Sequence, residues 1–189
     1  MRIGVEIIII SKLILNRSDI VNLLENLVQT LDDMETLVKV FEIEPFDIYF
    51  LGGAACILGG YSIRATRDFD FVDQNYKSHM GRAFAILRDY DMLEYESTAL
   101  SPGYKERSKK LDRFKAFNAY VLSPEDIIAS KIIRLEPKDM QDIDILIEIC
   151  DRDLLNRIIN EILARNDLYS EKKDAFKEKL KIFKDLYYV

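Results

Sequence analysis

One short stretch constrains this chain more than any other. Two aspartates alternate with two phenylalanines in Asp68-Phe69-Asp70-Phe71, within an otherwise apolar segment. In a β-strand, residues two apart project from the same side, so Asp68 and Asp70 lie together while the phenylalanines face a core. Two neighbouring carboxylates repel each other unless a cation lies between them or water surrounds both. Because oxygen ligands suit Mg²⁺ or Mn²⁺, the pattern predicts a divalent-cation site at Asp68 and Asp70.

A glycine-rich turn comes before the aspartates. Gly52 and Gly53 follow an apolar run and precede a short helical pattern, and glycine lets the backbone turn sharply and approach a ligand closely. A helix that begins there presents its first N–H groups to an anion, so we expect the two glycines to cradle phosphates. The alternative is that the glycines are ordinary turn residues and that the aspartates belong to a solvated strand edge.

The composition excludes several classes of site. The chain of 189 residues has one histidine, His79, and two cysteines far apart, Cys56 and Cys150. It therefore gives no basis for a histidine-based triad, a zinc site or a disulfide framework, and it indicates a reducing, cytoplasmic compartment. The net charge of −6 argues against nucleic-acid binding by bulk charge, although the basic stretch Gly103–Lys115 is a candidate contact for RNA or a triphosphate. The isoleucine-rich start, an edge strand or first helix by its pattern, is too short to span a bilayer, and no membrane partner is expected.

The order of the expected elements indicates an α+β fold. Apolar spacing and turn residues predict strands at 47–51, 68–72, 92–96 and 112–122, with a polar loop at 98–111. They predict helices at 18–42, 54–60, 78–90, from Ser123 to before Pro137, from near Pro137 onward, at 152–166 and at 171–187. We therefore expect a small mixed sheet flanked by helices in residues 1–122, and a helical C-terminal region packed on it in residues 123–189.

The glycines and aspartates belong to a longer pattern that resembles a known family. The chain is similar to motif I of the nucleotidyltransferase superfamily at Gly52, Gly53, Ala55, Gly60, Arg64, Thr66, Asp68 and Asp70. The likeness is greatest to the small nucleotidyltransferases of toxin–antitoxin and abortive-infection systems. Their motif usually ends Asp-Ile-Asp, where this chain has Asp-Phe-Asp. The resemblance implies the nucleotidyltransferase fold.

A second stretch, Tyr120–Leu146, resembles the second signature of that group, with a Ser-Pro-Glu-Asp helix start, a lysine on that helix and Lys-Asp-x-x-Asp on the next. Lys131 lies in the apolar stripe of its helix, where a lysine usually reaches a partner; a salt-bridged or snorkelling side chain is the alternative. The resemblance implies that Lys131 contacts nucleotide phosphates. It also implies that Asp139, taken with the nucleotide-binding residues, acts with Asp142 to hold the lysine helix at the active site.

The resemblance implies a third carboxylate on a later strand, since most active members of the superfamily have one. Asp112, at the start of the third clear strand, and Glu94 and Glu96, on the weaker strand, are the candidates, and the sequence selects none of them. This gap keeps open a rival hypothesis, in which the chain is an inactive nucleotide-binding or protein-interaction module on the same fold.

The resemblance implies a metal-dependent enzyme that moves a nucleotide from an NTP to an acceptor hydroxyl on RNA, tRNA or a protein. In that reading Asp68 and Asp70 hold one or two Mg²⁺ (or Mn²⁺) ions and carry catalysis. Arg64 and Thr66 brace the glycine-rich loop or contact phosphate. A toxin-like member would also have an antitoxin as partner.

Overall fold

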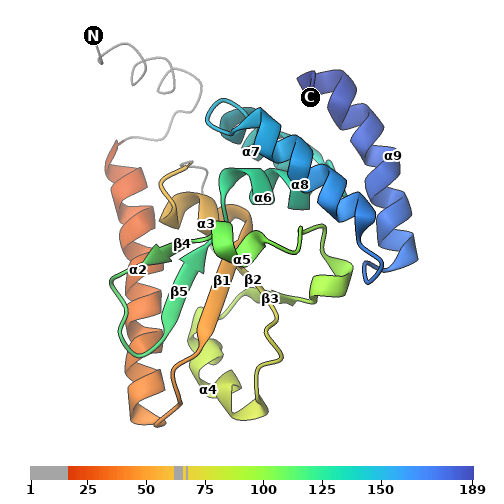
Figure 1. Cartoon of the computed structure of the whole chain (residues 1–189). Coiled ribbons are helices and arrows are strands. Elements are labelled where there is room, and N and C mark those ends of the chain that lie inside the picture. Colours follow the sequence, from red (N-terminus) through yellow and green to blue (C-terminus); the bar gives the residue numbers. More distant parts are fainter. Residues whose placement is uncertain (1–16, 62–65, 67) are drawn as a thin grey trace.

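A five-stranded mixed sheet forms the centre of the molecule. The computed structural model describes residues 17–61, 66 and 68–189. The strands are ordered β3-β2-β1-β5-β4 across the sheet (Figure 1). They span β1 Asp47–Leu51, β2 Phe69–Val72, β3 Tyr90–Leu93, β4 Lys109–Leu111 and β5 Asn118–Val121. β1 pairs antiparallel with β2 and parallel with β5, β2 pairs parallel with β3, and β4 pairs antiparallel with β5.

A long N-terminal helix packs beside the sheet. Helix α2, Arg17–Val40, runs along the left of the molecule in Figure 1 and packs against α3, Gly52–Leu58, and α4, Gly81–Phe84. Leu31 and Met34 of α2 are fully buried. The 3₁₀ turns η1, Ser78–Met80, and η2, Ala85–Leu87, flank α4. The helix expected at 78–90 is therefore present only as this broken series of turns.

The C-terminal part is helical, as expected. It contains α6 Pro124–Ile132, α7 Pro137–Leu146, α8 Arg152–Ala164 and α9 Ser170–Tyr187. The Ser123 side chain accepts a hydrogen bond from the Asp126 N–H and caps α6, with Pro124 at the first position. Helix α6 packs against α7, α8 and α9, and this group lies above the sheet in Figure 1.

The α+β fold with a mixed sheet and a helical C-terminal part is confirmed. Besides the helix at 78–90, three local expectations differ from the structure. Strand β3 begins at Tyr90 rather than at residue 92, and the last strand is confined to Asn118–Val121. The loop expected at 98–111 contains helix α5, Tyr104–Arg107, and strand β4, with the 3₁₀ turn η3, Tyr95–Ser97, just before it.

Other expectations about the whole chain remain predictions. One hydrophobic core runs from Leu27 of α2 to Phe183 of α9, and the division into 1–122 and 123–189 stays a prediction. The isoleucine-rich start lies outside the described residues. Across the described ranges, no helix combines the length and the apolar character needed to cross a bilayer. The cytoplasmic location also stays a prediction.

Candidate functional site

The turn from β1 into α3 brings a glycine against an aspartate. In the antiparallel pairing of β1 with β2, Leu51 lies opposite Asp70, so the next residue, Gly52, packs on the Asp70 side chain. Gly52 has a φ of +69°, and a Cβ built on it would lie 2.0 Å from Asp70 Oδ2. Only glycine fits this contact and this left-handed backbone. The sequence reading expected the glycine to make room for a ligand, and the structure adds that it makes room for the Asp70 carboxylate.

The two predicted aspartates lie at the start of β2. Phe69 and Phe71 are buried, with exposed fractions of 2% and 0%, and Asp68 is exposed. Asp70 is half-buried. Burial, followed by the negative charge of Asp91, raises the pKa of Asp70 to about 6, although the cations Lys131 and Arg134 oppose the shift. Asp70 is thus a carboxylate whose charge its own surroundings do not fully compensate.

A third carboxylate, Asp91, lies beside this pair. The parallel register of β2 with β3 places Asp91 opposite Asp70. Sequence reasoning missed Asp91 because it extended a helix through Tyr90 and began the strand at residue 92. The signal in the sequence was Tyr90-Asp91-Met92-Leu93, in which a single acid follows the first residue of a short strand.

The three acids proposed from the sequence lie elsewhere. Asp112 follows β4, which is at the opposite edge of the sheet from β3. Glu94 accepts a hydrogen bond from the Tyr169 hydroxyl at 3.4 Å, and Glu96 lies in η3. None of these three lines the cavities that Asp91 lines.

A cavity of about 540 Å³, called the first cavity below, brings most of the predicted residues together. Carboxylates and cations make up most of its lining, with one leucine, one glycine and one threonine beside them. The lining residues are Leu23, Gly53, Thr66, Asp68, Asp70, Asp91, Lys131, Arg134, Lys138 and Asp139. Arg64, also predicted for the site, lies outside the described residues. Among the residues that the structure describes, no three carboxylate, histidine or cysteine side chains are gathered closely enough to enclose a metal ion.

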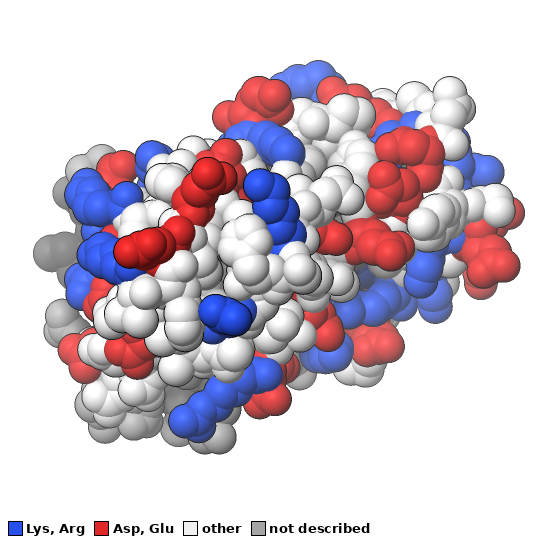
Figure 2. All heavy atoms as spheres, turned by 90° about the horizontal axis from the view of Figure 1, so that it is seen from below, with Lys and Arg blue, Asp and Glu red and all other residues white. Residues whose placement is uncertain are grey.

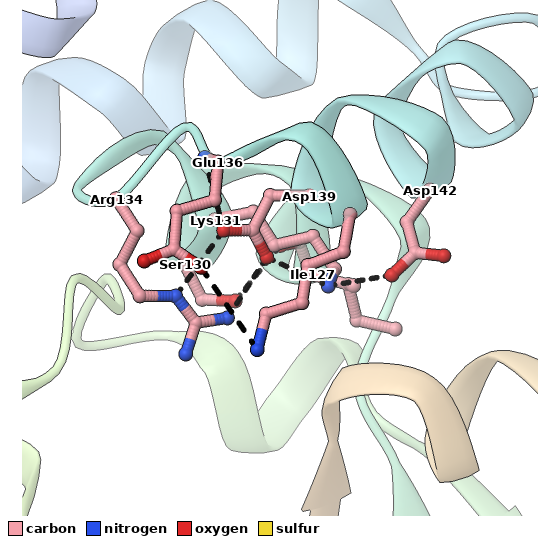
Figure 3. Close-up of polar contacts among 8 residues, drawn as sticks. Ile127, Ser130, Lys131, Arg134, Glu136, Asp139 and Asp142 are labelled. Atoms are coloured by element: carbon pink, nitrogen blue, oxygen red, sulfur yellow. Dashed lines mark hydrogen bonds and ion pairs between the residues drawn. The ribbon is translucent and has the colours of Figure 1, made fainter.

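Lys131 is buried and ion-paired with the two aspartates of α7. Its Nζ lies 2.7 Å from Asp142 Oδ2 and 3.3 Å from Asp139 Oδ1, and both aspartates are fully buried (Figure 3). Lys131 still contributes to the wall of the first cavity. The lysine therefore joins α6 to α7 and also adds positive charge beside the Asp70 carboxylate.

Arg134 completes this network from the turn that follows α6. Its guanidinium grips Asp139 with two hydrogen bonds, Nη2 to Oδ1 at 2.8 Å and Nε to Oδ2 at 3.2 Å (Figure 3). Burial alone would raise the pKa of Asp139, but the hydrogen bond from Arg134 and the charge of Lys131 outweigh it and hold the pKa below its ordinary value. The Asp139 carboxylate also accepts the Glu136 N–H and caps α7.

Two cations of the first cavity reach solvent. The Arg134 side chain is 53% exposed, and that of Lys138 is 59% exposed and pairs with Glu136 at 3.9 Å. The sequence reading assigned phosphate contact to Lys131 and did not consider Arg134. Exposed cations that line a cavity are suited to an incoming anion.

The basic stretch Gly103–Lys115 lies largely away from this cavity. Strand β4, within it, is at the far edge of the sheet from β3. Arg113 pairs with Asp32 at 2.6 Å, and Lys110 donates to Asn118 at 2.8 Å, so these charges have partners within the chain. Seen from below, acidic and basic side chains are interspersed around a largely uncharged area, without a continuous basic band on this face (Figure 2).

Comparison with known proteins identifies the family. A family model described as a nucleotidyltransferase of unknown function (DUF6036) matches residues 25–186. The match spans most of the chain, so the chain belongs to this family. No curated protein and no solved structure matches the chain significantly.

Proposed function

We propose that this family member transfers a nucleotidyl group from an NTP to an acceptor hydroxyl, using Asp68, Asp70 and Asp91. The supporting observation is that all three carboxylates line one cavity with three cations. A site that must hold both a divalent cation and a polyphosphate needs this mixture of charges. Family membership gives the general reaction class, and the site supports these residues within it.

We propose Mg²⁺ or Mn²⁺ as the cation, on the chemistry of the donor atoms. The candidate ligands are oxygen donors only, which these hard cations prefer. Burial and then the charge of Asp91 raise the pKa of Asp70, and a bound cation would favour the ionised form of this carboxylate. When bound, such an ion would neutralise phosphate charge and activate the acceptor hydroxyl as a nucleophile.

The phosphates would lie against the exposed cations of the first cavity. Arg134 and Lys138 would donate to phosphate oxygens, while the buried Lys131 adds charge from behind. Gly53 lines the same cavity, and because it has no side chain the phosphates could approach its backbone closely. Thr66 lines it too, and we propose that Thr66 and Arg64 brace the loop around the phosphates.

The reaction itself needs little covalent chemistry from the protein. The acceptor oxygen would form a bond to the α-phosphorus as the bond to the bridging oxygen breaks and pyrophosphate leaves. The proton of the hydroxyl would pass to a carboxylate at the Asp70–Asp91 junction. The role of the chain is to orient the triphosphate and balance its charge. We propose RNA, tRNA or a protein as the acceptor, with a toxin role and an antitoxin partner as the extension suggested by the resemblance.

A nucleotide-binding module without transfer is the second candidate. The observation in its favour is that, within the described residues, the acids are not gathered closely enough to enclose a metal ion. The two candidates differ in one outcome, because only the enzyme turns over bound NTP.

The experiment incubates the protein with Mg²⁺, each α-labelled NTP, and total RNA or cell lysate. Wild type is compared with Asp68→Asn, Asp70→Asn and the control Asp112→Asn. The proposal expects label transfer by wild type and the control, and a loss of at least about a hundredfold in the other two. NTP binding without transfer in any arm would favour the module. If the protein neither binds NTP nor transfers label, the nucleotide hypothesis is rejected.

A further inference from the structure

A second cavity shares its wall with the first. It has a volume of about 290 Å³, and both cavities are lined by Asp70, Asp91, Lys131 and Arg134. The two cavities therefore meet at the Asp70–Asp91 pair. A ligand that reacts at these carboxylates can therefore extend into both cavities.

The two cavities differ in chemical character. Leu23 is the single apolar side chain in the described lining of the first cavity, and the rest of that lining is charged apart from Gly53 and Thr66. The second cavity has apolar walls from several elements: Leu51, Leu93, Ala99, Ile133 and Ala175. A ligand that spans both needs a polyanionic part, a flat or apolar part, and the reacting atom between them.

Apart from its charged side chains, the second cavity has three hydroxyls in its lining, and their protons are already used. Ser130 donates its hydroxyl to the Ile127 carbonyl at 2.8 Å. Ser97 and Thr98 donate theirs to the Glu94 carbonyl at 3.0 and 2.7 Å. A hydroxyl that has donated its proton keeps lone pairs that accept hydrogen bonds. The cavity thus offers acceptors to a ligand that carries N–H donors.

The wall that carries Ser97 and Thr98 is held from beneath by a buried arginine. The Arg165 guanidinium donates to the backbone carbonyls of Tyr95, Thr98 and Leu100 at 2.9–3.0 Å and lies 3.6 Å from the centre of the Tyr95 ring. Its exposed fraction is 4%. Fixed acceptors discriminate between ligands better than mobile ones, because a mismatched ligand leaves them unpaired.

We propose that the second cavity binds the base of the NTP and favours bases with an exocyclic amino group. The inference rests on the proposed function, because it places the triphosphate in the first cavity and the α-phosphate at the Asp70–Asp91 junction. Ser97, Thr98 and Ser130 accept from the amino group, and Lys172 of α9, which lines the same cavity, donates to a ring nitrogen or carbonyl. The apolar side chains cover the faces of the base.

Cytosine and uracil give the sharpest test, since they are similar in size and differ only along one edge. Cytosine has an amino group at C4 and an acceptor at N3, whereas uracil has a carbonyl at C4 and a single N–H donor at N3. The experiment measures equilibrium binding of the full chain, with Mg²⁺, to inorganic tripolyphosphate and to non-hydrolysable α,β-methylene analogues of CTP and UTP. We expect the CTP analogue to bind about five- to tenfold more tightly than the UTP analogue, which is the effect of one or two hydrogen bonds.

Three variants locate the effect. Ser130→Ala should reduce the CTP-to-UTP preference to about twofold or less and leave tripolyphosphate binding unchanged. Ala175→Phe should fill the cavity and lower the affinity for both nucleotide analogues about tenfold, again without affecting tripolyphosphate. Ser108→Ala is the matched control, because Ser108 makes the same kind of bond, to the Tyr104 carbonyl at 2.8 Å, outside both cavities.

The outcomes separate this inference from the proposed function. Equal binding of tripolyphosphate and both nucleotide analogues, or a preference for the UTP analogue, would overturn the base site and leave the phosphate site standing. Unchanged nucleotide affinity in Ala175→Phe would do the same, and if transfer were lost in that variant the cavity would belong to the acceptor. A lack of binding by all three compounds would overturn both proposals.

Discussion

Two charged clusters lie within one site, and they are built in opposite ways. In the cation network, formed by Lys131, Arg134, Asp139 and Asp142, two positive charges meet two buried carboxylates. In the acid cluster, formed by Asp68, Asp70 and Asp91, burial and then the charge of Asp91 raise the pKa of Asp70 to about 6, although Lys131 and Arg134 oppose the shift. The first cluster is satisfied by the chain itself. In the second, the nearby cations do not offset burial and the neighbouring acid, and a carboxyl group with a raised pKa in a cavity is typical of a functional site.

The largest expected effect comes from breaking the cation network. Asp139→Ala removes a buried partner of Lys131 and Arg134 and the cap of α7, so we expect a loss of about 3–5 kcal/mol in the free energy of unfolding. Urea unfolding at pH 7 measures it. Because the pKa of Asp139 is lowered, its contribution is complete above its ordinary pKa of 3.8 and is lost as the pH falls through and below that value. A loss below about 1 kcal/mol would mean that the network contributes little.

The next effect tests the contact between Gly52 and the acid cluster. Gly52→Ala puts a Cβ against Asp70 Oδ2 at a φ of +69°, and we expect a loss of about 2–4 kcal/mol. Gly60→Ala is the matched control, because Gly60 has a φ of +74° and no atom of the described residues lies within 4 Å of the added Cβ, and it should cost about 1–2 kcal/mol. The double variant Gly52→Ala/Asp70→Ala should recover part of the difference. Equal losses at the two glycines would reject the contact.

A stabilising substitution would distinguish the acid cluster most clearly. Asp70→Asn removes an uncompensated charge, so without metal we expect a gain of about 1–3 kcal/mol above pH 7, together with loss of activity. The folded protein binds the Asp70 proton more tightly than the unfolded chain does. The stability of wild type therefore falls as the pH rises from about 4 to above 6, and the advantage of Asn should disappear below about pH 4. Thermal unfolding in EDTA across this pH range measures it, and a destabilised Asp70→Asn would contradict the comparison.

The smallest stability effect is expected at Lys138. Its pairing with Glu136 is exposed, so Lys138→Ala should change the free energy of unfolding by less than about 0.5 kcal/mol. The same variant should weaken tripolyphosphate binding about five- to tenfold, because a charge-assisted hydrogen bond is lost. Unchanged tripolyphosphate affinity would remove Lys138 from the phosphate site.

The sequence predicted those parts of the fold that depend on local patterns. The alternation of acids and phenylalanines predicted β2 and the burial of Phe69 and Phe71, which is confirmed. Ser123 and Pro124 predicted the start of α6, because capping chemistry involves only neighbouring residues.

The parts that depend on distant contacts could not be predicted in this way. Asp91 became a site candidate only through the pairing of β3 with β2, which a short strand at the sheet edge does not encode locally. The role of Arg134 likewise could not be predicted without the position of α7, since its partner Asp139 lies on that helix. Helix α5 and strand β4 of the basic stretch were not predicted, because they are only four and three residues long.

The central claim is that Asp91 completes a divalent-cation site with Asp68 and Asp70. Its most direct test is a titration with Mn²⁺, followed by electron paramagnetic resonance of the free ion, on wild type, Asp91→Asn and Asp112→Asn. We expect wild type and Asp112→Asn to bind Mn²⁺ alike, and Asp91→Asn to bind at least about tenfold more weakly, because a charged ligand is lost. Equal Mn²⁺ affinity in wild type and Asp91→Asn would contradict the claim.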